Sequence, residues 1–522
     1  MPTPSARRPP SSRKGFSDRM GDVKKNERIS RERLQQPPGQ VYTETVLEPS
    51  YRFMQQHYFA PLAETNKAWV TMLAETGIVP ADRARVLLRA VVDLAAEGPE
   101  AIAEFDPAYE YFYSHVEAKL TERAGEEAAG EVNIGRTRPE PLTRLVLRQR
   151  LLDVSALLTG LTTTLVDLAD REAETVMPQW THFQPAQPST VGHYLLGLAA
   201  AFGRDHERLT AAYRNTNECT LGCGALAGTS YPVDRELVAE LLGFDGVREN
   251  TIDCVSSGDF ALETTAALAN LMVTMSRLAQ DLYMWHTDEF GLVEIGDEFA
   301  GSSSMMPQKK NAYPFEYVRA RGAHAIGEMT SAFGTLHNTN FQDLKDVEEE
   351  MVPPLLRSLE ETERSLRLLD GTIRSLTIHR DRMAARAAAG FATATELAAV
   401  IHRTAGVDAR TAHRVVGHLV LRAVQAERDP ADIDAAMVAD AAREVLGRPI
   451  DLTDDAVRSA FDATAFVAAH TVLGGPAPAA VRASLDTARR RLDDQAGWLA
   501  ERRERLSAAE TRLADRVSKL LG

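Results

Sequence analysis

The sequence is poor in the features that mark secreted, membrane-spanning and nucleic-acid-binding proteins. Three cysteines in 522 residues are too few for a disulfide framework, so a reducing compartment is expected. No apolar stretch approaches the ~18–20 uncharged residues of a membrane span, and no apolar segment near Met1 resembles a secretory signal. A net charge of −15 argues against a nucleic-acid-binding surface, and no glycine-rich nucleotide loop is present. These absences predict a soluble cytoplasmic protein that binds neither nucleic acid nor membrane.

Positive charge is concentrated in the first 39 residues. They contain 10 Lys or Arg and 4 Asp or Glu, a net +6 that leaves −21 for the rest of the chain. The segment is rich in Pro, Ser and Arg and almost free of apolar residues, so it cannot bury enough surface to offset its chain entropy. A disordered basic tail is predicted over residues 1–40. It could be a docking arm or a solvated extension.

The remaining chain has the pattern of long helices. Ranges 142–176, 189–217, 258–287 and 312–338 each predict a helix well beyond the ordinary ~10–14 residues, which indicates a bundle of long rods. The predicted fold class is all-α, a long central helical bundle with smaller N- and C-terminal helical domains. A leucine every seven residues from 485 to 520 predicts a terminal helix that packs by one leucine edge, or alternatively a coiled coil. The predicted segments are the tail at 1–40, an N-terminal domain at 41–134, the bundle at 135–377, a C-terminal domain at 378–475 and the leucine helix at 476–522.

Three polar loops interrupt these rods. The loop at 133–139 places Thr137 between two arginines, whose guanidinium groups bind carboxylates in a bidentate fashion. The loop at 181–188 places His182 among amides and prolines. Alone, the first is typical of a surface turn and the second of a structural histidine. The loop at 301–311 is more specific, because its serines precede two lysines and an asparagine, which suits a mobile loop with a base candidate beside cationic groups.

Together these loops resemble the fumarase/aspartase superfamily, most closely its argininosuccinate lyase branch. The resemblance covers about residues 58–485, and its motifs lie at 135–138, 181–184, 222–230 and 306–311, the last being the superfamily signature. It implies anti β-elimination from an N-substituted aspartate or a similar succinyl compound, with release of fumarate. It also implies a homotetramer in which loops of three subunits build each active site, with no metal and no organic cofactor.

The resemblance also implies roles for individual residues. Ser303 would be the base, with Ser302 as the alternative because the preceding glycine is displaced by one position. Lys309 and Asn311 would hold the substrate carboxylate on which negative charge grows, as in an oxyanion hole. His182 would pair with Glu316 and protonate the leaving amine or orient the site. The implied substrate ligands are Thr137, Arg138, Thr181, Gln184 and Ser302.

The residues that hold the arginine half in argininosuccinate lyases are replaced. The family's Tyr, Gln and Lys fall on Asn340, Lys345 and Glu348, and an acidic residue near the start falls on Tyr111. A site built for specific hydrogen bonds discriminates strongly against partners that lack them. The prediction is therefore a carbon–nitrogen lyase whose amine half differs from arginine, comparable to ethylenediaminedisuccinate lyase. Lys345 and Tyr111 would suit a leaving group with a further carboxylate or an apolar surface.

Three alternatives remain. The first is argininosuccinate lyase itself, in arginine biosynthesis, with a misaligned loop around Asn340. The second is a catalytically silent structural homologue, which would lack the base or the His–Glu pair; Ser303, His182 and Glu316 are all present. The third is a metal protein using Cys219 and Cys223, but their Cys-x₃-Cys spacing has no matching second pair, so small buried thiols are the better account.

Overall fold

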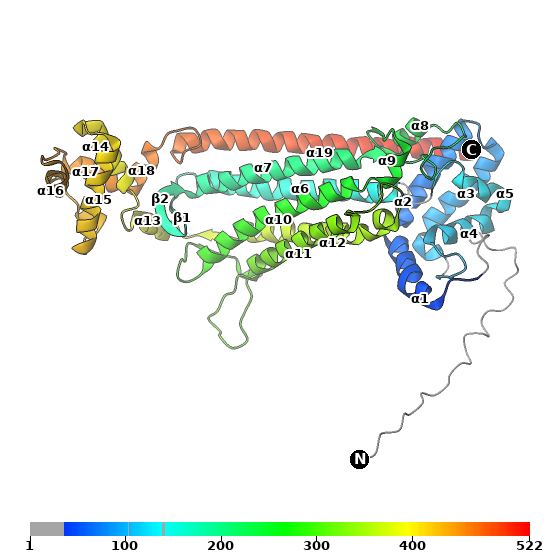
Figure 1. Ribbon diagram of the computed structural model, residues 1–522, viewed down its shortest axis with the longest axis horizontal. Helices are drawn as coiled ribbons and strands as arrows, with labels where there is room; N and C mark the ends of the chain where they lie inside the picture. The colour runs from blue at the N-terminus through cyan, green and yellow to red at the C-terminus, as the bar shows by residue number, and fades with distance from the viewer. Residues whose placement is uncertain (1–35, 103, 138–140) are drawn as a thin grey trace, which may run out of the picture. The chain divides into compact units, whose positions relative to one another are not determined.

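The computed structural model describes residues 36–102, 104–137 and 141–522 (Figure 1). Most of the predicted basic tail, residues 1–35, lies outside these ranges. The chain forms two compact units: the first comprises residues up to 142 with 221–242 and 511–522, and the second comprises 143–220 and 243–510. The all-α prediction is confirmed, since every sheet in the described residues is a short pair of strands.

The first unit is built on α2 (Glu48–Glu75), in which Trp69, Met72 and Leu73 are fully buried. After α2, the chain turns through Gly77 (φ 70°) and restarts behind Pro80, where the sequence pattern also breaks. The other helices of this unit are α1 (Gln40–Tyr42), α3 (Ala81–Glu97), α4 (Phe112–Ala124), α5 (Glu126–Ala129) and α8 (Arg235–Leu242).

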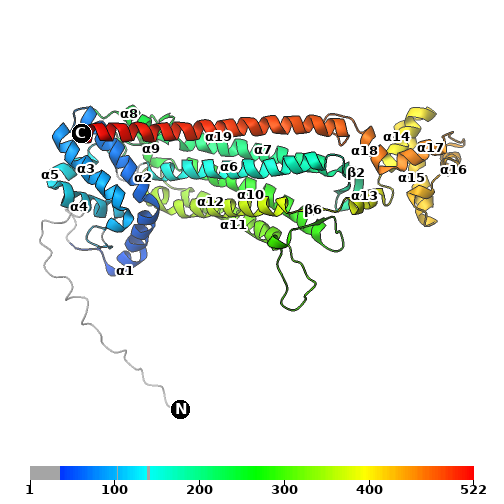
Figure 2. The same cartoon turned by 180° about the vertical axis from the view of Figure 1, so that it is seen from behind.

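The second unit contains a bundle of long helices that run side by side (Figures 1 and 2). The four long helices expected from the sequence are present within a few residues of their predicted bounds, and a fifth follows them. They are α6 (Leu142–Arg171), α7 (Val191–Thr216), α10 (Asp259–His286), α11 (Tyr313–Leu336) and α12 (Val352–Arg374).

Helix α6 corrects one expectation from the sequence. It contains an 18-residue window with mean hydropathy 1.4 and no more than two charged residues, so it is long and apolar enough to cross a membrane by length and composition. The prediction that no stretch approaches this composition was therefore wrong. The physical reason lies in the bundle, where 61% of that window is buried, because a helix with neighbours on several sides is apolar around most of its circumference.

Short strand pairs and small helices complete the second unit. The hairpin of β1 (Val176–Thr181) and β2 (Gln184–Thr190) joins α6 to α7. The other strands are β3 (Glu218–Cys219) with β4 (Gly246–Val247), parallel, and β5 (Val293–Glu294) with β6 (Thr377–Ile378), antiparallel. The small helices are α9 (Thr251–Ser256), α13 (Arg380–Ala388), α14 (Ala394–Ala405), α15 (Ala409–Gln425), α16 (Ala435–Leu446), α17 (Asp454–Phe461) and α18 (Ala463–Ala469).

The leucine repeat lies on α19 (Pro478–Leu521), which packs along its own chain rather than forming a separate coiled coil. Leu485, Leu499 and Leu506 are buried. The ring of Trp498 lies 5.4 Å from that of Tyr213 on α7, and the two rings meet edge to face. The predicted packing by one leucine edge is confirmed for this part of the helix.

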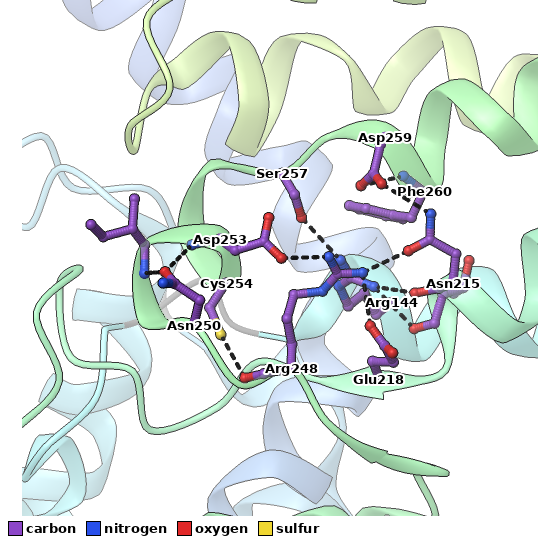
Figure 3. A network of polar contacts seen from close by, with 12 residues as sticks. Arg144, Asn215, Glu218, Arg248, Asn250, Asp253, Cys254, Ser257, Asp259 and Phe260 are labelled. Carbon is purple, nitrogen blue, oxygen red and sulfur yellow. Dashed lines mark hydrogen bonds and ion pairs between the residues drawn. The ribbon is translucent and has the colours of Figure 1, made fainter.

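A polar network closes the end of the bundle where α6 begins, α7 ends and α10 begins (Figure 3). Arg144 donates to the backbone carbonyl of Asn215 (2.6 Å) and lies over the ring of Phe260, 4.2 Å from its centroid. Arg248 donates to the Asn215 side chain (2.6 Å) and pairs with Asp253 (2.7 Å). Burial, together with the nearby charge of Arg248, lowers the pKa of Arg144 to about 10, so the side chain stays cationic at neutral pH. Arg144 thus satisfies backbone carbonyl groups at the C-terminal end of α7, and Arg248 holds the side chain of Asn215 beside them.

The three cysteines, all within the described residues, form no disulfide with one another and are buried. The thiol of Cys223 donates to the carbonyl of Gly224, and that of Cys254 to the carbonyl of Arg248. Within the described ranges no group of three or more His, Cys, Asp or Glu side chains is placed to hold a metal ion.

Candidate functional site

The serine-rich loop lies between α10 and α11 and extends away from the bundle (Figures 1 and 2). Its neck is closed by Gly301 and Asn311, whose backbones exchange hydrogen bonds of 2.8 and 2.9 Å. The Asn311 side chain also donates to the Gly301 carbonyl (3.0 Å). The ring of Tyr313 covers Gly301 so closely that an added Cβ would lie 2.0 Å from it. Position 301 is therefore a glycine because Tyr313 packs on its backbone.

Within this loop the hydroxyl of Ser303 is distinguished from that of Ser302. The Ser303 oxygen accepts a hydrogen bond from the backbone N–H of Met306 (3.0 Å) and a longer one from that of Met305 (3.4 Å). Two backbone dipoles aimed at one oxygen stabilise negative charge on it, which a serine needs in order to act as a base. Ser302 is exposed and makes no hydrogen bond to a described residue. This geometry favours Ser303 over Ser302 as the base.

A cavity of about 1110 Å³ lies beside the neck of this loop, and Lys309, Asn311 and Glu316 line it. The two lysines differ in their surroundings. Lys310 pairs with Glu294 of β5 (2.8 Å) and with Asp297 (2.7 Å), so it anchors the loop. Lys309 is exposed, and although its backbone N–H donates to the carbonyl of Met306 (3.1 Å), its ammonium forms neither a hydrogen bond nor an ion pair with any residue in the described ranges. The ammonium is therefore available to an anionic ligand at the cavity.

Glu316 and His182 do not meet within one chain. Glu316, in the first turn of α11, accepts a hydrogen bond from the hydroxyl of Tyr283 (3.1 Å), and this bond raises the pKa of Tyr283. His182 lies at the tip of the β1–β2 hairpin, exposed and without a hydrogen bond to any described residue; Thr181 and Gln184 flank it and are exposed as well. The predicted His182–Glu316 pair stays a prediction for contact between chains.

Tyr283 was not predicted from the sequence. It lies 33 residues before its partner Glu316, so no local motif connects the two. The one available signal is its position in the last turns of the apolar helix α10, where a half-exposed hydroxyl stands among buried side chains.

In the first unit, the arginine loop and the glycine-rich motif at 222–230 lie against each other. Arg136 pairs with Gly224 through the backbone, and its side chain bonds to Asn66. The indole N–H of Trp69 donates to the carbonyl that precedes Gly135 (3.1 Å). Thr137 follows Arg136 directly and is half-buried. Arg138 lies outside the described residues.

Two of the residues expected to face the amine half, Asn340 and Lys345, are far from Ser303 in one chain. Asn340 and Lys345 follow the C-terminal end of α11, whereas Ser303 precedes its N-terminal end. A helix of 24 residues is about 36 Å long. Tyr111 belongs to the first unit, where it caps α4 and its carbonyl bonds to the His115 ring (2.8 Å). Because the length of α11 separates Asn340 and Lys345 from Ser303, a single chain does not assemble the whole predicted set.

Lys345 is less available than the sequence suggested. Its ammonium donates to Glu348 (2.8 Å) and Glu349 (2.6 Å). Burial by itself would lower the pKa of Lys345, but these two carboxylates outweigh it and raise the pKa. A carboxylate on the leaving group would meet a charge that is already compensated.

An ion pair fixes the base of the hairpin that carries His182. The buried carboxylate of Glu172, at the end of α6, accepts hydrogen bonds from Arg380 of α13 (2.6 and 2.8 Å) and from Thr175 (2.6 Å). Burial by itself would raise the pKa of Glu172, but the bonds from Arg380 and Thr175 outweigh it, so the pKa lies below the usual 4.5.

Replacing this carboxylate should weaken the fold in a pH-dependent way. A depressed carboxyl pKa contributes stability above the unfolded-state pKa, and this contribution is lost as pH falls through the folded-state pKa. Glu172→Gln should therefore lower the thermal unfolding midpoint by about 2–4 °C at pH 7. The difference from the unmutated chain should shrink below pH 4.5, the usual value for this group. Asp455→Asn, which removes an exposed pair with Arg458, is the control and should change little. An equal difference at pH 7 and pH 3.5 would contradict the prediction.

The geometry can be compared with known proteins. Residues 40–327 match a family model described as lyase, and residues 391–468 match one described as argininosuccinate lyase C-terminal. Argininosuccinate lyase from Methanothermobacter thermautotrophicus is 38% identical over 82% of this chain and 92% of its own length. Argininosuccinate lyase 1 from Shouchella clausii is 34% identical over 92% and 96%. The crystal structure of EDDS lyase in complex with formate superposes with a TM-score of 0.83 at 30% identity, covering 93% of this chain and 96% of that one.

Proposed function

The chain belongs to the argininosuccinate lyase branch of the fumarase/aspartase superfamily and is a fumarate-releasing carbon–nitrogen lyase, and from this premise we propose that its leaving amine is not arginine. The substrate is an N-substituted aspartate, and the reaction is a reversible anti β-elimination in the cytoplasm. The observation that carries the proposal is that Asn340, Lys345 and Glu348 stand where the family has Tyr, Gln and Lys, in the acidic segment after α11. Between 343 and 350 it holds five carboxylates and one lysine, and Lys345 is paired with Glu348 and Glu349.

The proposed chemistry uses groups whose surroundings suit each step. Ser303 removes the proton beside the distal carboxylate, because two backbone N–H groups support charge on its oxygen. Lys309 balances the charge that grows on that carboxylate. The carbon–nitrogen bond then breaks, and His182, paired with Glu316 of another copy, protonates the departing amine. The pair of electrons from the C–H bond forms the fumarate double bond, and the amine leaves with the C–N pair.

This chemistry requires more than one copy of the chain, and we propose a homotetramer in which three copies contribute to each site. Two observations support it. Ser303 and Lys345 lie at opposite ends of α11, so one chain cannot place both at one substrate. Helix α11 also exposes the large apolar side chains of Tyr317, Ile326 and Phe333, which a neighbouring copy would cover.

The acidic segment supports a cationic amine half, such as an aliphatic diamine, over one that carries a carboxylate. Tyr111 replaces the acidic residue expected to face a guanidinium, and Asn340 and Glu348 replace the family's Tyr and Lys. The second candidate is argininosuccinate cleavage. It is favoured by the names of the relatives that are 34–38% identical, and an acidic segment would also tolerate the cationic guanidinium of arginine.

Running the enzyme backward separates the two candidates. Purified protein is incubated with fumarate and one amine at a time: arginine, ethylenediamine, longer diamines, a monoamine and glutamate. Adducts are read by mass spectrometry. We expect a diamine adduct to form at least about a hundredfold faster than argininosuccinate, because a mismatched hydrogen-bonding site rejects its ligand strongly. Addition of arginine alone would overturn the proposed amine. If nothing adds and argininosuccinate is also not cleaved, the succinyl half must be reconsidered.

A further inference from the structure

The turn that presents His182 has an unusual backbone. Thr181 pairs with Gln184, so β1 and β2 are joined by just two residues, His182 and Phe183. Their φ angles are 52° and 62°. Positive φ at both central positions is the pattern of a type I′ hairpin turn, which favours Asn-Gly. A histidine and a phenylalanine are strained there, because Cβ crowds the backbone in the left-handed region.

Strain of this kind persists only where the surroundings hold it. The ring of Phe183, although 63% exposed, meets the ring of Phe290 edge to face at 6.0 Å. Phe290 in turn lies 6.1 Å from Trp180 of β1. Trp180 lies 5.8 Å from Trp285 at the end of α10. Both sides of the turn are thus attached to the same short segment, 285–290.

The aromatic contacts continue into the bundle. Trp285 is buried and lies 4.8 Å from Tyr194 of α7. The hydroxyl of Tyr194 donates to Asp281 on α10 (2.7 Å), one turn before Trp285. Burial and the facing carboxylate raise the pKa of Tyr194 well above its usual value, so the phenol stays a donor at any working pH. The turn therefore has a rigid support that reaches the two long helices.

The imidazole of His182 has no support of its own. It is exposed and makes no hydrogen bond to any described residue of its chain. Within its own chain, the position of the imidazole is consequently set by the turn backbone and not by side-chain contacts. A small displacement of an acid–base group can reduce the rate of the chemical step by as much as about a hundredfold.

We propose that Phe183 and Phe290 are positioning residues, which hold the strained turn so that His182 reaches the leaving amine in one geometry. The inference rests on the proposed function, in which His182 delivers a proton. The proposal explains why a phenylalanine stands at position 183 of the turn with Phe290 packed on it. A turn with the less strained sequence His-Gly would have a freer backbone, and the imidazole of His182 would no longer be held in one position.

Two substitutions separate positioning from ordinary packing. Phe183→Gly relieves the positive-φ strain and frees the turn, while Phe290→Leu removes the ring that holds it. We expect kcat for fumarate release to fall at least about tenfold in each, with a smaller change in KM, because no predicted substrate ligand is itself replaced, although Thr181 and Gln184 flank the turn. Phe290→Tyr keeps the ring contact and should restore kcat. The thermal midpoint of Phe183→Gly should be unchanged or higher, since a strained residue has been replaced by one that accepts the conformation.

A matched control is available in the Phe391–Phe461 pair, whose rings also meet edge to face at 6.0 Å. Phe391 lies in the turn before α14, and Phe461 lies at the end of α17. Phe461→Leu should lower the thermal midpoint and leave kcat unchanged. The proposal is wrong if kcat survives in Phe183→Gly and Phe290→Leu, or if KM rises while kcat holds. If the unmutated protein releases no fumarate from any N-substituted aspartate, the proposed function fails. The strain in the turn is then tested by the thermal unfolding midpoint alone. A lower midpoint in Phe183→Gly than in the unmutated protein would refute the strain, and an equal or higher one would support it.

Discussion

Replacing Ser303 by alanine should lower kcat for fumarate release by about a thousandfold or more, which is the range expected for loss of a general base. The N–H groups of Met305 and Met306 are directed at the Ser303 oxygen. Among the serines of this loop, Ser303 is therefore the one whose deprotonated oxygen is best stabilised. Fumarate absorbance in the ultraviolet reports the rate directly. Substrate binding should be nearly unchanged, because the removed oxygen acts on the proton and not on the carboxylate.

Ser302→Ala is the matched control. Ser302 precedes Ser303, is exposed, and has no hydrogen bond to a described residue, so its loss should reduce kcat less than about tenfold. The reverse ranking of the two variants would make Ser302 the base and the observed N–H bonds incidental. Equal and small effects in both would mean that neither serine removes the proton.

Replacing Gly224 by alanine should both destabilise the first unit and weaken substrate binding. Gly224 has a φ of 62°, and an added Cβ would lie 2.3 Å from the carbonyl oxygen of Gly228, an atom of the backbone that cannot move aside cheaply. The positive φ and the overlap together cost about 2–4 kcal/mol. Because Gly224 pairs with Arg136, the displacement reaches the segment that contains Thr137. We expect a lower unfolding midpoint and KM raised at least about tenfold.

Gly130→Ala tests whether any glycine of the first unit would behave in this way. Gly130 has no positive φ, and nothing lies within 4 Å of an added Cβ, so stability and KM should be unchanged. If Gly224→Ala folds normally but leaves KM unaltered, the 222–230 motif does not support the arginine loop. If both glycine variants lose stability equally, the effect is not specific to the overlap with Gly228.

Much of the second unit could be predicted because its helices are long and their pattern is local. The pattern at 142–176 predicts α6. In the first unit, Gly77 and Pro80 likewise mark a break that the structure places within a residue or two. The serine loop was equally predictable as a loop. That Asn311 closes its neck was not, because the partner Gly301 lies ten residues away and the bond depends on how the loop folds back.

The sequence predicted least well which charged side chains are free to bind a ligand and which are already paired. Lys309 and Lys310 are adjacent and chemically identical, yet Lys310 is held by Glu294 and Asp297 while Lys309 is open to the cavity. Lys345, expected to hold a leaving-group carboxylate, is paired with two carboxylates of its own segment. An ion pair depends on which side chains are brought within about 4 Å, and residue identity alone does not determine this.

By itself, the sequence determined the fold class, the family and the loops that carry its chemistry, because helix periodicity and the motif at 306–311 are properties of adjacent residues. Tertiary structure alone decided which serine oxygen receives backbone N–H groups, which lysine stays unpaired and how His182 is presented on a strained turn. It also separated Ser303 from Lys345 by the length of α11. The physical reason is the same in each case: hydrogen bonds, ion pairs and backbone strain act over a few ångströms in space, and only the folded chain brings residues remote in sequence within that range.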